Sequence, residues 1–88
     1  MDVLDELEEF RKLSDIDRLQ VRDVYDYLKK LKIHLHRAQT SYEIVSFFDG
    51  IISRGAVLKH LERLVSWKEI RRLKIKVGKY DCYFYEII

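Results

Sequence analysis

Arg54 and Lys59 have the most readily interpreted chemistry in this 88-residue chain. They lie within residues 53–64, where apolar residues recur at helical spacing, at Val57, Leu61 and Leu64. A helix that turns this stripe inward turns both cations outward. A guanidinium can donate two parallel hydrogen bonds to the edge of a guanine, and an ammonium can bind guanine or phosphate. The spacing therefore predicts an exposed basic helix face suited to duplex DNA.

Other residues are candidates for the same chemistry. Gly55 would permit close approach of the backbone, Leu58 could touch a thymine methyl, and Arg63 would lie toward a flanking phosphate. The remaining candidates lie before and after this helix, at Arg37, Ser41, Tyr42, Arg72, Lys74, Lys76 and Lys79. These would contact the sugar-phosphate backbone, and the last two would reach a minor groove.

The charge distribution supports this interpretation. Residues 1–26 hold nine acidic and four basic residues, whereas residues 50–80 hold nine basic and two acidic ones. Cations gathered in one region favour binding of nucleic acid more than the net charge of +2 does.

Other chemistry finds little support in the residues. No Gly-rich phosphate loop or nucleophile motif is present, so we expect no enzymatic activity. The spacing of His34, His36, His60 and Cys82 matches no common zinc site, so neither metal nor cofactor is expected. No cluster of polar residues indicates a small-molecule ligand. Three tyrosines near the C-terminus are expected to cover a sheet face rather than stack on bases, namely Tyr80, Tyr83 and Tyr85.

The elements that would position these residues follow from periodicity and capping. Helices are expected over 2–13, 15–32, 42–48 and 54–66, and a short strand over 33–38. Thr40 or Ser41 would cap the third helix and Ser53 the fourth. The expected buried stripes of the second, third and fourth helices are Ile16, Leu19, Val24, Leu28 and Leu31; Ile44, Val45, Phe47 and Phe48; and Val57, Leu61, Leu64 and Val65.

A β-hairpin is expected to close the chain. Gly78-Lys79 suits a two-residue type II′ turn, although a longer turn through Asp81 keeps the same parity. This turn places apolar pairs on one face, at Val77–Tyr80, Ile75–Cys82 and Leu73–Phe84. The other face would carry Lys76–Asp81, Lys74–Tyr83 and Arg72–Tyr85. A one-residue slip would invert every side chain, so both faces support this register.

From residue 16 onward, the chain resembles the winged helix-turn-helix domains of prokaryotic and archaeal transcriptional regulators. The resemblance rests on Ser53-Arg-Gly-Ala-Val-Leu-Lys-His-Leu-Glu-Arg-Leu64, followed by Ile70-Arg71 and the basic hairpin. It implies an α+β fold with a three-helix core, a C-terminal two-stranded wing and an extra N-terminal helix. The implied function is sequence-specific binding of double-stranded DNA, with recognition helix 53–66 in the major groove and wing 70–87 on the backbone or minor groove.

The chain departs from the family pattern at one position. Lys68 stands where such domains often have a glycine that ends the recognition helix. A left-handed glycine cap is therefore absent, and we expect the helix to end differently or to run longer. The small size is similar to that of compact regulators from archaea and their viruses. The lack of Asn, with only two Gln, is typical of a thermophilic source.

The length predicts one domain over residues 15–88, preceded by a helix over residues 1–14. This first helix is expected to join two chains into a homodimer, and docking onto the second helix of its own chain is the alternative. No apolar run approaches a membrane span, so the protein is expected in the cytoplasm, or the host cytoplasm if viral.

Two other functions remain open from the sequence. The first is a winged-helix module for protein contact in a transcription or replication assembly, in which the acidic first helix and Leu58 would form the binding surface. The second is a binder of single strands or RNA that uses the hairpin tyrosines. Cys82, the one cysteine, is expected to be a half-buried thiol rather than an intermolecular bridge.

Overall fold

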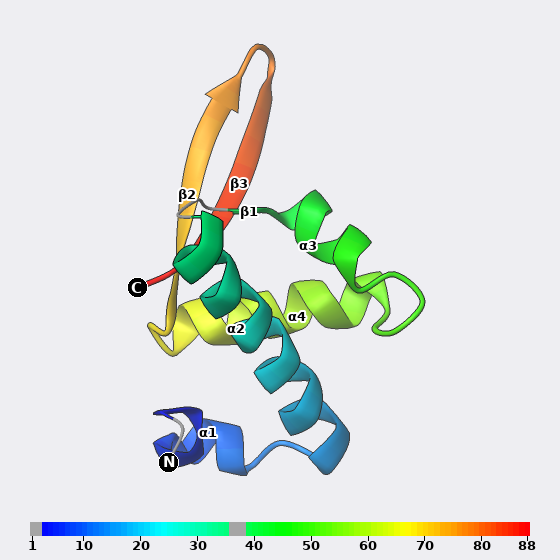
Figure 1. Ribbon diagram of the computed structural model, residues 1–88, viewed down its shortest axis with the longest axis vertical. Helices are drawn as coiled ribbons and strands as arrows, with labels where there is room; N and C mark the ends of the chain where they lie inside the picture. The colour runs from blue at the N-terminus through cyan, green and yellow to red at the C-terminus, as the bar shows by residue number, and fades with distance from the viewer. Residues whose placement is uncertain (1–2, 36–38) are drawn as a thin grey trace.

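A computed structural model describes residues 3–35 and 39–88, and these form an α+β fold (Figure 1). The helical elements are η1 (Val3–Glu6, a 3-10 helix), α1 (Glu8–Arg11), α2 (Asp15–Leu35), α3 (Ser41–Phe47) and α4 (Arg54–Ser66). The strands β1 (Gln39–Thr40), β2 (Ile70–Val77) and β3 (Tyr80–Ile87) form an antiparallel sheet in the order β1-β3-β2. Among the described residues, no helix combines the length and apolar character that crossing a membrane requires.

Helix α4 has the expected bounds and cap. The Oγ of Ser53 accepts a hydrogen bond from the backbone N–H of Ala56 at 3.2 Å, which satisfies one donor of the first turn. Three residues of its expected inner stripe are fully buried, namely Val57, Leu61 and Leu64. The fourth, Val65, is half-buried at the edge of the core. The opposite face of α4 is therefore free to face solvent or a partner.

The C-terminus of α4 corrects the expectation drawn from Lys68. The helix does end at a left-handed residue, and that residue is Lys68 itself, with φ of 62°. The N–H of Lys68 donates to the carbonyl of Val65, and the N–H of Glu69 donates to the carbonyl of Leu64, both at 3.0 Å. These two bonds form a Schellman motif. They offset the strain of a left-handed conformation in a residue that carries a Cβ.

Replacing Lys68 with glycine should therefore stabilise the fold. The backbone conformation stays the same while the Cβ strain disappears, so we expect a gain of about 1 kcal/mol in the free energy of unfolding. Urea unfolding followed by the fluorescence of Trp67 measures the gain. Lys68→Ala is the matched control: it removes the ammonium but keeps the Cβ, and it should give no gain. Equal effects of the two variants would contradict this account of the cap.

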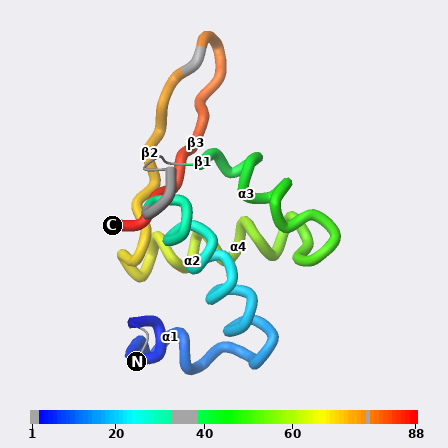
Figure 2. Tube along the Cα trace, in the orientation of Figure 1, coloured from blue at the N-terminus to red at the C-terminus, as the bar shows by residue number. Residues whose placement is uncertain are grey.

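The hairpin has the expected register. All six predicted pairs are present, from Arg72–Tyr85 to Val77–Tyr80, and the first turn residue, Gly78, has φ of 62°. The strands run side by side away from the helices, and the chain returns along β3 to the hairpin base (Figure 2). The buried side chains at this base are Ile70, Tyr85 and Ile87. Arg72, Lys74 and Lys76 lie on the same face of the hairpin as these buried residues. At the hairpin base, this is therefore the face turned toward the helices.

The buried face of α2 differs from the expected stripe. Ile16 and Leu19 are 70% and 66% exposed, whereas Val21, Val24, Tyr25 and Leu28 are buried. The partly buried Leu31 packs against this core. Helix α4 crosses α2 on the side of Gln20, where His60 contacts the Gln20 amide. This contact sets the rotation of α2 about its axis, and the first two apolar residues of the pattern then point outward.

The expected strand over residues 33–38 is wrong in its first half. Helix α2 continues to Leu35, residues 36–38, with Arg37 among them, lie outside the described residues, and the strand β1 begins only at Gln39. β1 is short because it pairs with β3 only at Gln39–Tyr85 and Thr40–Phe84. An alternating sequence does not make a strand without a partner edge.

Helix α3 has the expected position but a different buried face. Ile44 and Phe48 are buried and Val45 is half-buried, whereas Phe47 is 56% exposed. The Phe47 ring instead stacks on the outward side of Tyr27, with ring centroids 3.9 Å apart. A helix of seven residues makes only about two turns, so the four apolar residues within 44–48 cannot all lie on its inner face.

The N-terminal segment is not one helix over residues 2–13. η1 and α1 are separated at Leu7, whose backbone is extended. The break lets both Leu4 and Phe10 become buried, and the Phe10 ring packs edge-on against Trp67 with centroids 6.3 Å apart. The structure thus shows the segment docked on its own chain. The homodimer through residues 1–14 stays a prediction, and these two side chains are already used within one chain.

Candidate nucleic-acid interface

The outer face of α4 carries the residues that the stripe predicts. Arg54, Gly55, Lys59 and Glu62 are exposed, and Leu58 is half-buried. Around Gly55 the surface is open: a Cβ built there meets no atom within 4 Å. The face is therefore accessible over about two and a half turns and places two cations beside a position without a side chain.

Four of the predicted contact residues surround one small hollow between α3 and α4. Ser41 and Tyr42 come from the first turn of α3, and Arg54 and Leu58 come from the first turns of α4. Val45 forms the remaining wall, and the hollow measures about 120 Å³. Sequence reasoning assigned Val45 to the core and missed this role, because only the packing of α3 on α4 brings it there.

Thr40 holds α3 in this position. Its hydroxyl accepts a hydrogen bond from the N–H of Glu43 at 3.1 Å, and the Glu43 carboxylate accepts one from the N–H of Thr40 at 3.3 Å. This capping box begins the helix. Because Thr40 also pairs with Phe84 of β3, the start of α3 is tied directly to the sheet. The rim of the hollow is therefore connected to the base of the hairpin.

Arg72 joins the hairpin to α4. Its guanidinium donates to the carboxylate of Glu62, which projects from the outer face of α4. It also lies over the ring of Tyr83, 5.3 Å from the centroid, and beside its strand partner Tyr85. The neighbouring Tyr85 hydroxyl, followed by the charge of Glu62, raises the pKa of Arg72, while burial raises the pKa of Tyr85. Arg72 therefore links the hairpin to α4 through its ion pair with Glu62.

The same hairpin face continues outward through lysines. Lys74 and Lys76 follow Arg72 at alternate positions of β2, so their side chains leave the strand on the same face as that of Arg72. Lys74 lies 3.5 Å from the carboxylate of Asp81, and Lys76 and Lys79 are exposed near the turn. Tyr83 shares this face and is partly exposed, whereas Tyr85 is buried. The expected role of covering a sheet face agrees with the burial of Tyr85, whereas Tyr83 is 40% exposed and its ring lies under the guanidinium of Arg72.

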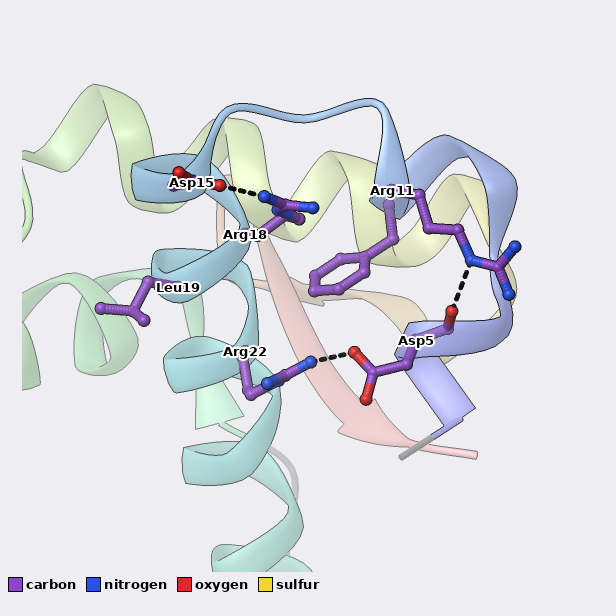
Figure 3. A pocket seen from close by; sticks show the side chains of 7 residues that line it. Asp5, Arg11, Asp15, Arg18, Leu19 and Arg22 are labelled. Carbon is purple, nitrogen blue, oxygen red and sulfur yellow. Dashed lines mark hydrogen bonds and ion pairs between the residues drawn. The ribbon is translucent and has the colours of Figure 1, made fainter. Parts of the chain in front are cut away.

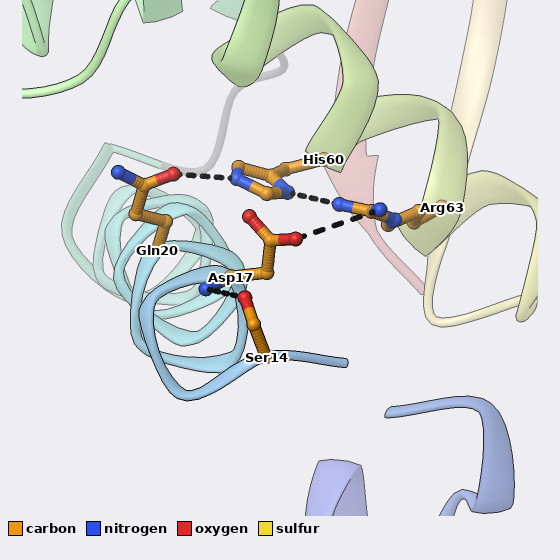
Figure 4. Close-up of polar contacts among 5 residues, drawn as sticks. All are labelled: Ser14, Asp17, Gln20, His60 and Arg63. Carbon is orange, nitrogen blue, oxygen red and sulfur yellow. Dashed lines mark hydrogen bonds and ion pairs between the residues drawn. The ribbon is translucent and has the colours of Figure 1, made fainter. Parts of the chain in front are cut away.

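Arg63 lies apart from the other predicted residues. Its side chain turns toward α2, where it reaches the carboxylate of Asp17 at 3.8 Å and the Nδ1 of His60 at 3.0 Å (Figure 4). Arg63 therefore supports the packing of α4 on α2 and is not part of the face formed by Arg54 and Lys59. Sequence spacing alone left Arg63 at the boundary between the two faces.

His60 is the buried centre of this contact between α2 and α4. Arg63 can only donate a hydrogen bond, so the Nδ1 of His60 accepts, and its Nε2–H donates to the Oε1 of Gln20 at 2.9 Å. This is the neutral form of the ring. Burial, and next the positive charge of Arg63, lower the pKa of His60 below its usual 6.5, against an opposing effect of Asp17. A protonated His60 would lose the bond from Arg63 and face its charge.

Stability should therefore decrease as the pH falls below about 6.5. In that range the unfolded chain takes up a proton at His60 and the folded chain does not, so the contribution of neutral His60 is complete above 6.5 and is lost below it. Urea unfolding at pH 7.5 and 5.5 measures the change. His60→Gln should be less stable at pH 7.5 but lose less stability between the two values. An identical loss in both proteins would contradict a role for His60.

A second hollow lies between the N-terminal segment and α2 and measures about 360 Å³ (Figure 3). Its cations are matched by acceptors within the hollow. Arg22 is paired with Asp5, Arg18 with Asp15, and the Nε–H of Arg11 donates to the carbonyl of Asp5 at 2.8 Å. This arrangement explains how an acidic segment is held on α2, and it gives the hollow little excess charge for an anion.

None of the protein-family models, curated proteins or solved structures compared with the chain matches it. Within residues 3–35 and 39–88, no group of three or more His, Cys, Asp or Glu residues is arranged to hold a metal ion. The candidate interface is therefore defined by three features of the structure. These are the exposed face of α4, the hollow at the N-terminal end of α4, and the hairpin face with Lys74 and Lys76, which Arg72 links to α4.

Proposed function

We propose that the chain is a winged helix-turn-helix domain that binds double-stranded DNA sequence-specifically and regulates transcription without catalysing a reaction. In this proposal α3 and α4 are the helix-turn-helix pair, α4 is the recognition helix, and β2 with β3 is the wing. A helix such as α4 fits the major groove, which is about 12 Å wide. The lysines of the wing would then follow the phosphates beside it.

The observation that carries the proposal is the bridge between Arg72 and Glu62. It supports the proposal because it joins the face of β2 that carries Lys74 and Lys76 to Glu62 on the exposed face of α4. Two positively charged surfaces that lie side by side match a ligand whose groove edges and phosphates also lie side by side. Asp5 of the N-terminal segment is paired with Arg22 elsewhere, in the hollow of Figure 3.

Fluorescence anisotropy with labelled DNA duplexes tests the proposal. Affinity should rise steeply as salt is lowered, with log K falling by about 0.9 per unit of log salt for each phosphate contacted. A duplex selected from a random pool should bind more tightly than an unselected one. Absence of duplex binding at 50 mM salt would refute the proposal and favour the protein-contact module, and tighter binding of single strands would favour the third function.

Gly55→Ala separates loss of contact from loss of fold. Alanine is the better helix former and the added Cβ meets no atom in the free protein, so stability should rise by about 0.5–1 kcal/mol. The same Cβ would stand between α4 and the DNA, so affinity for the selected duplex should fall by about tenfold, as an estimate for one disturbed close contact. Urea unfolding and anisotropy measure the two effects. Unchanged affinity in a stabilised variant would show that Gly55 does not approach DNA.

A further inference from the structure

The hollow between α3 and α4 contains two aliphatic side chains that contact with a phosphate or a sugar would not explain. Its lining includes the aliphatic side chains of Val45 and Leu58, both half-buried. The polar groups stand around it: the hydroxyls of Ser41 and Tyr42 on one side and Arg54 on the other. It is thus a hollow lined by two apolar side chains together with two hydroxyls and one cation. Such a site matches a small apolar group attached to a polar, anionic molecule.

The volume and position of the hollow restrict which chemical group could occupy it. A volume of about 120 Å³ is larger than the roughly 30 Å³ that a water molecule occupies in the liquid, and a methyl group is of similar size to a water molecule. Leu58 lies four residues after Arg54 and therefore on the same face of α4, about 6 Å further along the axis.

We propose that this hollow receives the C5-methyl group of a thymine in duplex DNA, one or two base pairs from a guanine that Arg54 binds. Thymine is the only ordinary base with a methyl group in the major groove, and guanine presents the two acceptors that a guanidinium fits. Cytosine would instead direct its amino donor at apolar walls that cannot accept it. The inference rests on the proposed function and assigns part of its sequence preference to named side chains.

The experiment removes only the methyl group. A duplex is first selected from a random pool, and each thymine within two base pairs of a guanine is then replaced, one at a time, by deoxyuridine. Base pairing is unchanged, so a loss of affinity reports contact with the methyl. At one position we expect wild-type affinity to fall about three- to fivefold, as for the loss of one buried methyl group. 5-Methyldeoxycytidine paired with guanine at that position should bind more tightly than deoxycytidine.

Variants assign the effect to the hollow. Leu58→Ala should bind the thymine and uracil duplexes with equal affinity, because the wall that contacts the methyl is gone. Val45→Thr keeps the shape but puts a hydroxyl in place of a methyl group, so it should reduce the difference in affinity between the thymine and uracil duplexes. This variant provides the test if Leu58→Ala folds poorly. Lys76→Gln, on the wing, should keep the full three- to fivefold difference while binding both duplexes more weakly. Arg54→Ala should relax the preference for guanine.

The outcomes separate this inference from the proposed function. Binding to duplex DNA with no thymine sensitive to uracil would overturn the inference and leave the proposed function standing. A methyl effect that persists in both Leu58→Ala and Val45→Thr would also overturn it, because the contact would lie elsewhere. Absence of binding to any duplex would refute the proposed function itself.

Discussion

Replacing Lys76 and Lys79 together with glutamine is expected to weaken binding to every DNA duplex, by on the order of 10–100-fold at 50 mM salt. Both residues are exposed at the outer end of the hairpin, Lys76 on the face that Arg72 links to α4 and Lys79 in the turn. Each is proposed to neutralise a phosphate and release a counterion. Phosphates carry no sequence information, so selected and random duplexes should be affected alike.

The dependence on salt is the sharper measurement. Loss of two phosphate contacts should reduce the slope of log K against log salt by about 1.8, so the variant should approach wild-type affinity as salt rises. Lys12→Gln with Lys29→Gln is the matched control, because it removes the same charge from exposed positions on α1's C-cap and on α2. An equal loss in both pairs would show that net charge, rather than the wing, drives binding.

Leu61→Ala is expected to lower the free energy of unfolding by about 3–4 kcal/mol. Leu61 is fully buried on the inner face of α4, beside the equally buried Val57 and Leu64. Truncation removes the transfer energy of the side chain and leaves a cavity. A domain of this size has only about 4–13 kcal/mol of stability in total, so a large share of it would be lost.

Leu58→Ala is the matched control for this prediction. It makes the same chemical change three residues earlier on α4, at a half-buried position beside the hollow, and should cost about 1 kcal/mol or less. Urea unfolding followed by Trp67 fluorescence measures both. The ring of Trp67 packs against Phe10, so the signal also reports docking of the N-terminal segment. Equal losses in the two variants would contradict the assignment of inner and outer faces.

The parts of the fold predicted well from the sequence have local causes. The bounds of α4 follow from the Ser53 cap and the apolar spacing, and the register of the hairpin follows from Gly78 and the alternation on either side. Each signal acts between residues close in the chain, so its free energy is largely independent of the rest of the molecule. The outward position of Arg54 and Lys59 follows directly from these local patterns.

The errors concern segments whose conformation depends on distant partners. Residues 33–35 alternate like a strand but remain helical, since β3 offers an edge only to Gln39 and Thr40. The N-terminal segment has a helical pattern, yet Leu7 is extended so that Leu4 and Phe10 can both be buried. A helix this short is marginal alone, and the burial of two large side chains outweighs it.

The sequence by itself determined which residues of α4 and of the hairpin share a face, because helical and strand periodicity are properties of the local backbone. Only the tertiary structure decided which face meets which neighbour. Arg63 and Arg54 are chemically identical, but Asp17 and His60 hold the first against α2, while the second lines the hollow beside Val45. The position of each arginine depends on burial and charge interactions between segments far apart in the chain. A local sequence pattern does not reveal the free energy of those interactions.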